Sequence, residues 1–158
     1  MTATAIRVLF LCTGNSARSQ IAEALLARVG GRDFESHSAG TEPNGVNPFT
    51  IRVLAELGID WSKARSKSLT EFLDQPWDYV ITVCDRARQA CPIFPGAHDT
   101  LHWDLADPAE VEGTDEERLE AFRATRSALT TRIRSFAEHA LRQRGTAAAA
   151  TASRPTPG

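Results

Sequence analysis

Hydrophobic residues along this chain form two kinds of pattern, short apolar runs and longer stretches with helical spacing. The two clearest runs predict strands at residues 6–11 and 79–83, and shorter patterns predict strands at 34–38 and 99–103. Apolar residues three or four positions apart are typical of helices, and they predict helices at 17–29, 48–57, 69–73 and 115–142. Strands that alternate with helices are typical of parallel sheets. We therefore expect an α/β fold with a four-stranded parallel sheet flanked by helices.

The predicted helices each have one apolar face, which we expect to pack on the sheet. The inward positions are Ile21, Ala24, Leu25 and Val29, then Ile51, Val53, Leu54 and Leu57, then Leu119, Phe122, Leu129, Ile133, Phe136 and Leu141. From Gly145 onward the composition is mostly Ala, Thr, Pro and Gly, which is typical of disorder. We therefore expect one domain over residues 1–144 and a disordered tail over 145–158.

The composition of the chain argues against several classes of function and partner for this domain. The formal net charge is −2, which gives no support for a nucleic-acid or membrane partner. No apolar run reaches the ~20 residues of a membrane-spanning helix, and residues 8–11 are too few for a signal-peptide core. We therefore expect a cytoplasmic protein and take a monomer as the default. In that compartment the three cysteines indicate chemistry rather than a disulfide scaffold.

Metal binding has little support in the sequence. The chain contains no Cys-x-x-Cys pair, and His98 and His102 lack companion ligands at a recognisable spacing. We therefore expect neither a metal site nor another cofactor.

The most informative segment directly follows the first predicted strand, and it reads Cys12-Thr13-Gly14-Asn15-Ser16-Ala17-Arg18-Ser19. Cys12 supplies a thiolate nucleophile, Arg18 a planar fork for two oxygens, and Ser19 a hydrogen-bond donor to the thiolate. The next helix N-terminus adds positive potential. The predicted oxyanion-binding residues are Thr13, Gly14, Asn15, Ser16, Ala17 and Arg18. We prefer this interpretation to an ordinary strand–helix turn because position, spacing and residue types agree.

Asp107, which precedes Pro108, is the candidate general acid. A departing oxygen needs a proton, and a carboxyl held beside the site can donate it. An Asp-Pro pair by itself is more often a simple turn, so this assignment depends on the cysteine loop.

Cys84 and Cys91 form a second pair of thiols on either side of a short polar segment. A hydrolytic phosphatase needs one cysteine, whereas a reductase needs a dithiol to supply two electrons. An ideal helix over 85–90 would hold the two Cα atoms roughly 10 Å apart, beyond disulfide reach. We therefore expect this segment to be helical when reduced and to rearrange on oxidation.

Together these segments resemble the thioredoxin-coupled arsenate reductases, which share the fold of the low-molecular-weight protein tyrosine phosphatases. The resemblance runs from about Ile6 to the long C-terminal helix. The matching stretches are 12–16, 18–20, 22–23, 38–40, 45–48, 82–84, 91–93, Trp103 and 107–108. The Cys12 loop is common to both groups, whereas the Cys84/Cys91 pair is specific to the reductases.

The resemblance implies a thiol relay from arsenate to thioredoxin. Cys12 attacks arsenate, Cys84 attacks the Cys12 adduct and releases arsenite, and Cys91 then forms a disulfide with Cys84 that thioredoxin reduces. Some family members bind potassium near the loop through residues matching Asn15, Glu23 and Ser38. Lys67 stands where an aspartate would be expected, so its ammonium group can replace the cation, and we expect no potassium requirement.

Two other functions remain open at this point. A tyrosine phosphatase would use Cys12, Arg18 and Asp107 alone, although the shortage of aromatic residues near Asp107 disfavours it. A non-enzymatic anion or redox sensor would not need the complete set of nucleophile, arginine and acid. The sequence also leaves the reductant open, because a glutaredoxin or another thiol system could serve.

Overall fold

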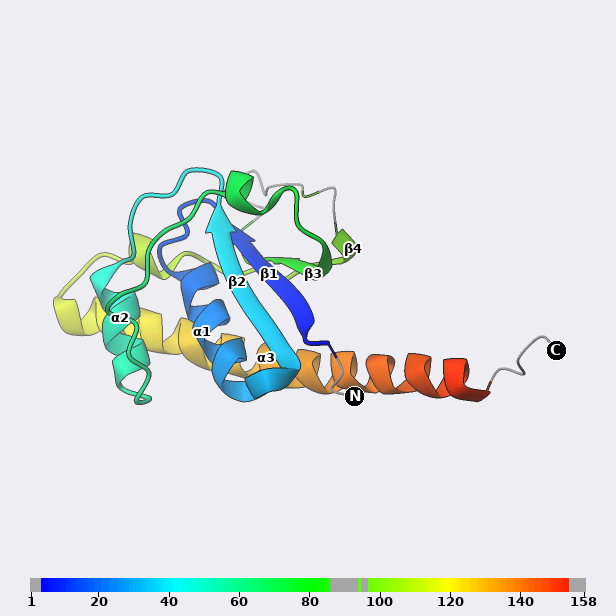
Figure 1. Ribbon diagram of the computed structural model, residues 1–158. Coiled ribbons are helices and arrows are strands. Elements are labelled where there is room, and N and C mark those ends of the chain that lie inside the picture. Colours follow the sequence, from blue (N-terminus) through cyan, green and yellow to red (C-terminus); the bar gives the residue numbers. More distant parts are fainter. Residues whose placement is uncertain (1–3, 86–93, 95–96, 154–158) are drawn as a thin grey trace.

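The computed structural model describes residues 4–85, 94 and 97–153. Its centre is a parallel sheet in the order β2-β1-β3-β4 (Figure 1). The strands are β1 (Ile6–Cys12), β2 (Phe34–Gly40), β3 (Trp77–Thr82) and β4 (Ala97–His102). This confirms the predicted fold class. Strand boundaries differ from the prediction by one or two residues at several ends.

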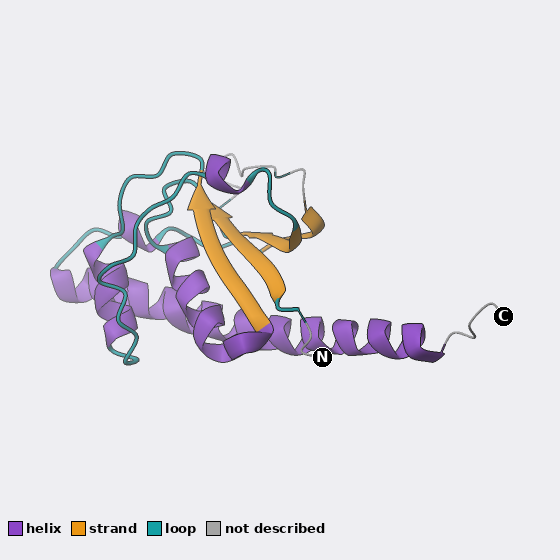
Figure 2. Cartoon of the chain, viewed as in Figure 1, coloured by secondary structure: helices purple, strands orange, loops and turns teal. Residues whose placement is uncertain are grey.

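Three α-helices cover one face of this sheet (Figure 2). They are α1 (Arg18–Gly30), α2 (Pro48–Ala55) and α3 (Asp115–Ser153). Val8 and Phe10 of β1 point toward them and are fully buried, whereas Leu9 and Leu11 point to the opposite face. On that opposite face a second cluster contains Phe72 of the short 3-10 helix Leu69–Phe72, Trp77 of β3 and Phe94. The alternation explains why β1 is apolar apart from Arg7.

The predicted inward positions are mostly correct, with exceptions at the helix ends. Leu119, Phe122, Leu129 and Ile133 are buried. In contrast, Val29 in the last turn of α1 and Leu57 are exposed and border a surface groove. The helix predicted to 57 ends at Ala55, so Leu57 lies in the turn that follows α2. Ile51 and Leu141 are half-buried.

The C-terminal helix extends further than predicted. Instead of ending at 142, α3 continues to Ser153, so residues 145–153 of the expected disordered tail are helical (Figure 1). Alanine has the highest helix propensity, and the run of alanines at 147–150 offsets the cost of about 1 kcal/mol for Gly145. Among the described residues, no helix is both long and apolar enough to cross a membrane.

Candidate active site

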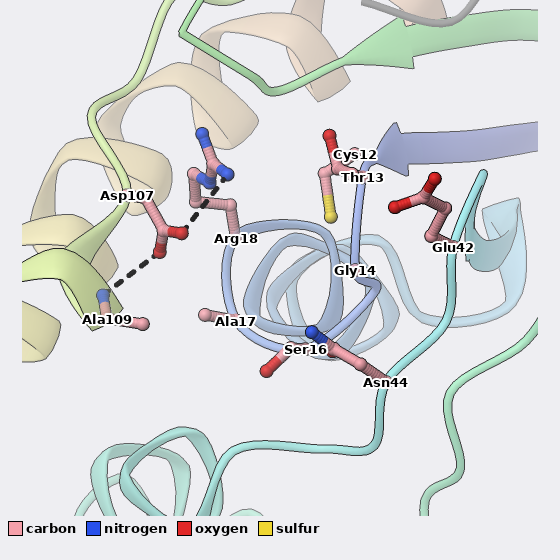
Figure 3. Close-up of a pocket in the computed structure, with 10 residues that line it drawn as sticks. All are labelled: Cys12, Thr13, Gly14, Ser16, Ala17, Arg18, Glu42, Asn44, Asp107 and Ala109. Carbon is pink, nitrogen blue, oxygen red and sulfur yellow. Dashed lines mark hydrogen bonds and ion pairs between the residues drawn. The ribbon is translucent and has the colours of Figure 1, made fainter. Parts of the chain in front are cut away.

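The loop between β1 and α1 forms one wall of a cavity of about 170 Å³ (Figure 3). Cys12 ends β1 at the base of this pocket, and its side chain is almost fully buried. The Cys12 sulfur lies 2.8 Å from the Ser19 hydroxyl, as the prediction for Ser19 requires. The pocket-lining residues are Cys12, Thr13, Gly14, Ser16, Ala17, Arg18, Glu42, Asn44, Asp107 and Ala109.

The N-terminus of α1 adds positive potential to this loop. Ala17 is the N-cap residue, and no side chain caps the first backbone N–H groups of the helix. Uncapped N–H groups and the helix dipole together favour an anion at this end. The loop is therefore suited to bind a small oxyanion in front of the Cys12 sulfur.

Asn15 supports the loop through its side chain, from the side that faces away from the pocket. Its φ of 48° lies in the left-handed region, which is uncommon for a residue other than glycine. The side chain is fully buried and donates hydrogen bonds to Ser19 Oγ (2.8 Å) and Ser38 Oγ (2.9 Å). Its Oδ1 accepts hydrogen bonds from Gln20 Nε2 and the Lys67 backbone N–H. The Asn15 side chain thus faces the protein interior and orients Ser19 toward Cys12. A role for Asn15 in binding the oxyanion remains a prediction.

Arg18 and Asp107 meet at the opposite side of the pocket (Figure 3). The Arg18 side chain is buried, donates from Nη1 to the Leu105 carbonyl (2.9 Å) and lies with Nη2 3.6 Å from Asp107 Oδ2. Asp107 Oδ1 accepts a hydrogen bond from the Ala109 backbone N–H at 3.0 Å. The short turn after Asp107 therefore fixes its carboxyl group at the pocket, and its role as proton donor stays a prediction.

Cys84 follows β3 at the same edge of the sheet as Cys12. Strands β1 and β3 are paired neighbours with Leu11 opposite Thr82, and the Val83 N–H donates to the Leu11 carbonyl. Cys84 is fully buried and disulfide-bonded in this structure, whereas Cys12 is a free thiol. The predicted partner Cys91 and residues 86–90 of the helix expected over 85–90 lie outside the described residues, and Asp85 lies in no helix. Because the helix is expected in the reduced form and Cys84 is disulfide-bonded here, it stays a prediction.

A buried network beside the loop contains Lys67. Its ammonium Nζ lies 3.2 Å from Glu23 Oε1, and the same oxygen accepts a hydrogen bond from Ser38. The ammonium group thus contacts Glu23, and Glu23 in turn bonds Ser38; both belong to the residues that resemble a potassium site. In the described part of the chain, no group of three His, Cys, Asp or Glu side chains is arranged to hold a metal ion.

Sequence reasoning missed Glu42, Asn44 and Ala109 as pocket-lining residues. Ala109 could have been inferred from its position after Asp107-Pro108. Glu42 and Asn44 carry no local motif, because they reach the pocket only through backbone hydrogen bonds to Thr13 and Gly14.

Comparison with known proteins agrees with this geometry. Residues 7–147 match the model of the low molecular weight phosphotyrosine protein phosphatase family. The chain is 43% identical over 131 residues to an arsenate reductase of Halalkalibacterium halodurans, covering 83% of this chain and 94% of that protein.

Solved structures show the same similarity. An arsenate reductase in the phosphate binding state superimposes with a TM-score of 0.70 at 30% identity, covering 85% of this chain and 98% of that one. A thioredoxin-dependent arsenate reductase from Corynebacterium glutamicum gives a TM-score of 0.58 at 35% identity, covering 85% of this chain and 64% of that one.

Proposed function

The chain belongs to the low molecular weight phosphotyrosine protein phosphatase family, and we propose that it is the oxidoreductase that converts arsenate to arsenite. The observation that carries this proposal is the position of two cysteines at the ends of adjacent strands, Cys12 in the oxyanion loop and Cys84 after β3. The similarity to arsenate reductases over most of the chain supports it independently.

The first step is attack by the Cys12 thiolate on arsenic. A bond forms between sulfur and arsenic, and one arsenate oxygen departs as water after receiving a proton from Asp107. Backbone N–H groups of the loop and the Arg18 guanidinium stabilise the charge on the remaining oxygens. The arsenic is still pentavalent in this adduct.

The second step is the reduction itself. The Cys84 thiolate attacks the Cys12 sulfur, the sulfur–arsenic bond breaks, and its electron pair stays on arsenic, which leaves as arsenite. Cys12 and Cys84 are thereby oxidised to a disulfide. Cys91 then attacks Cys84, frees Cys12 and leaves a Cys84–Cys91 disulfide, which thioredoxin reduces with its own dithiol.

We further propose that the protein acts in the cytoplasm as a monomer, without a nucleic-acid or membrane partner. A thiol relay needs a reducing compartment. The formal net charge of −2 gives no electrostatic attraction for nucleic acid.

A coupled assay tests the relay. Arsenite is measured for each enzyme molecule in the presence of arsenate, thioredoxin, thioredoxin reductase and NADPH. We expect sustained turnover from the unaltered protein and none from Cys12→Ser or Cys84→Ser. Cys91→Ser should release about one arsenite and stop as a Cys12–Cys84 disulfide, visible by mass spectrometry. Sustained turnover by both Cys84→Ser and Cys91→Ser would contradict the relay.

The second candidate function is phosphate-ester hydrolysis, which the family match favours. It would use Cys12, Arg18 and Asp107 without the other thiols. No aromatic side chain is among the residues that line the pocket in the described chain, so a phosphotyrosine ring has no stacking surface there. Hydrolysis of phenyl phosphate by Cys84→Ser, without arsenite production, would show that the loop retains this chemistry while the reductase needs the second thiol.

A further inference from the structure

Two carboxylates border the pocket from opposite sides, Asp107 and Glu42 (Figure 3). Asp107 is held by Arg18 and by the Ala109 backbone N–H. Glu42 is different, because its carboxylate forms no hydrogen bond or ion pair with any residue that the structure describes. A carboxylate beside an anion pocket repels a fully deprotonated anion, because like charges that face each other weaken binding.

The backbone positions Glu42 firmly although its side chain is exposed. The Glu42 N–H donates to the Thr13 carbonyl (2.9 Å), and the Asn44 N–H donates to the Gly14 carbonyl (3.1 Å). These two hydrogen bonds hold residues 42–44 against the loop, so that both Glu42 and Asn44 line the pocket. A Cβ atom at Gly14 would lie 2.7 Å from Asn44 Oδ1, so the glycine permits this close contact. The backbone hydrogen bonds therefore position Glu42 so that its carboxylate faces the pocket (Figure 3).

An ionised carboxylate only accepts hydrogen bonds. It repels an oxyanion that has no proton, but it forms a charge-assisted hydrogen bond with an oxyanion that carries a hydroxyl group. Arsenate and phosphate keep one proton at neutral pH, whereas sulfate is fully deprotonated. A site built to bind a hydroxyl group rejects an analogue that lacks one.

We propose that Glu42 is a specificity-determining residue that selects protonated oxyanions, arsenate and phosphate, and rejects sulfate. Its carboxylate accepts the hydrogen bond from the As–OH or P–OH group, while the loop N–H groups and Arg18 bind the unprotonated oxygens. This proposal rests on the proposed function, since it names the substrate class of the same pocket.

The selection of phosphate over sulfate is tested by measuring anion binding in the absence of turnover. The reduced protein is treated with iodoacetamide, and the alkylation rate of Cys12 is measured by mass spectrometry at increasing phosphate or sulfate concentration. The half-protecting concentration reports the affinity of each anion. Because no arsenic is reduced, the result is independent of whether the thiol relay operates.

We expect the unaltered protein to prefer phosphate strongly. Glu42→Gln should lower the preference for phosphate over sulfate about tenfold, a modest factor because Glu42 is exposed to solvent. Most of the change should come from tighter sulfate binding. Glu112→Gln is the matched control, since it removes the same charge from an exposed position outside the pocket, and it should leave the preference unchanged. An unchanged preference in Glu42→Gln, or an equal change in Glu112→Gln, would overturn the proposal.

Discussion

At the residue scale, the Ser19 side chain contacts the predicted nucleophile in the loop between β1 and α1, because its hydroxyl lies 2.8 Å from the Cys12 sulfur. Ser19 is itself oriented by Asn15, whose side chain also bonds Ser38. We therefore expect the chemistry to depend on residues that do not line the pocket. A substitution at Asn15 would affect the nucleophile through Ser19 as well as through the left-handed backbone at that position.

Asp107 provides a prediction at the residue scale. Asp107→Ala should slow the first chemical step by ~10²–10⁴-fold, which is the usual contribution of a positioned acid. The fold should persist, because Asp107 is only partly buried and lies in a short turn. The measurement is formation of the Cys12 adduct in a single turnover, with circular dichroism as the control for folding. A folded variant with an unchanged rate would mean that water or another group supplies the proton.

At the scale of secondary structure, Glu56, the C-cap residue of α2, joins α2 to α3 on the protein surface. Its carboxylate binds Arg123 Nη2 (2.7 Å) and Arg126 Nη1 (2.8 Å) of α3, and Arg126 also donates to the Val53 carbonyl. Hydrogen bonds from Arg123 and then from Arg126 lower the pKa of Glu56 from 4.5 to about 2. Because the lowered pKa keeps the Glu56 carboxylate ionised in acid, its ion pairs join α2 to α3 at acidic as well as neutral pH.

This arrangement predicts a pH-dependent contribution to stability. A carboxyl group whose pKa is lowered by folding stabilises the protein above its unfolded pKa, and the contribution is lost as pH falls through the folded value. Glu56→Gln should lower the free energy of unfolding by about 1 kcal/mol at pH 7, since the Glu56 side chain is 33% exposed to screening solvent.

The difference between Glu56→Gln and the unaltered protein should shrink as pH falls from 4.5 to about 2. Urea unfolding across this range measures it. Glu138→Gln, an exposed change elsewhere on α3, should show no such pH dependence. A difference that stays constant with pH would contradict the assigned cause.

The order of the elements could be predicted from sequence because apolar runs and helical spacing are local signals. The apolar run of β1 indicated burial on both faces, but it could not show that all three α-helices share one face. Cys12 and Arg18 could be predicted because they stand in one continuous loop motif, and Asp107 because it precedes a proline; all three line the pocket, and their catalytic roles stay predictions. Glu42 was missed because only tertiary backbone pairing brings it to the pocket. The end of α3 was misjudged because a compositional rule for disorder was given more weight than alanine's helix propensity.

At the scale of the whole molecule, α3 contacts the segments that precede β1 and β2, at the end of the sheet opposite the pocket. Arg144 of α3 binds Asp33 (3.2 Å), which follows α1, and donates to the Thr4 carbonyl. Ala140 is buried in the main core and Leu141 packs against it. Beyond this point α3 runs past the sheet (Figure 1). The described contacts of α3 thus include Arg144, and the domain boundary expected at residue 144 stays a prediction that truncation can test.

Two truncations separate the part of α3 that stabilises the domain from the part that extends beyond it. A chain ending at Gly145 should keep its melting temperature within about 2 °C and its arsenate reductase activity, because it retains Ala140, Leu141 and Arg144. A chain ending at His139 loses these contacts, and the exposed apolar surface should cost about 2–3 kcal/mol, or roughly 5–10 °C in melting temperature. Calorimetry with an activity assay at 25 °C compares the two. Equal melting temperatures would show that the end of α3 contributes nothing to the domain, whereas a large loss in the longer chain would show that residues after 145 belong to it.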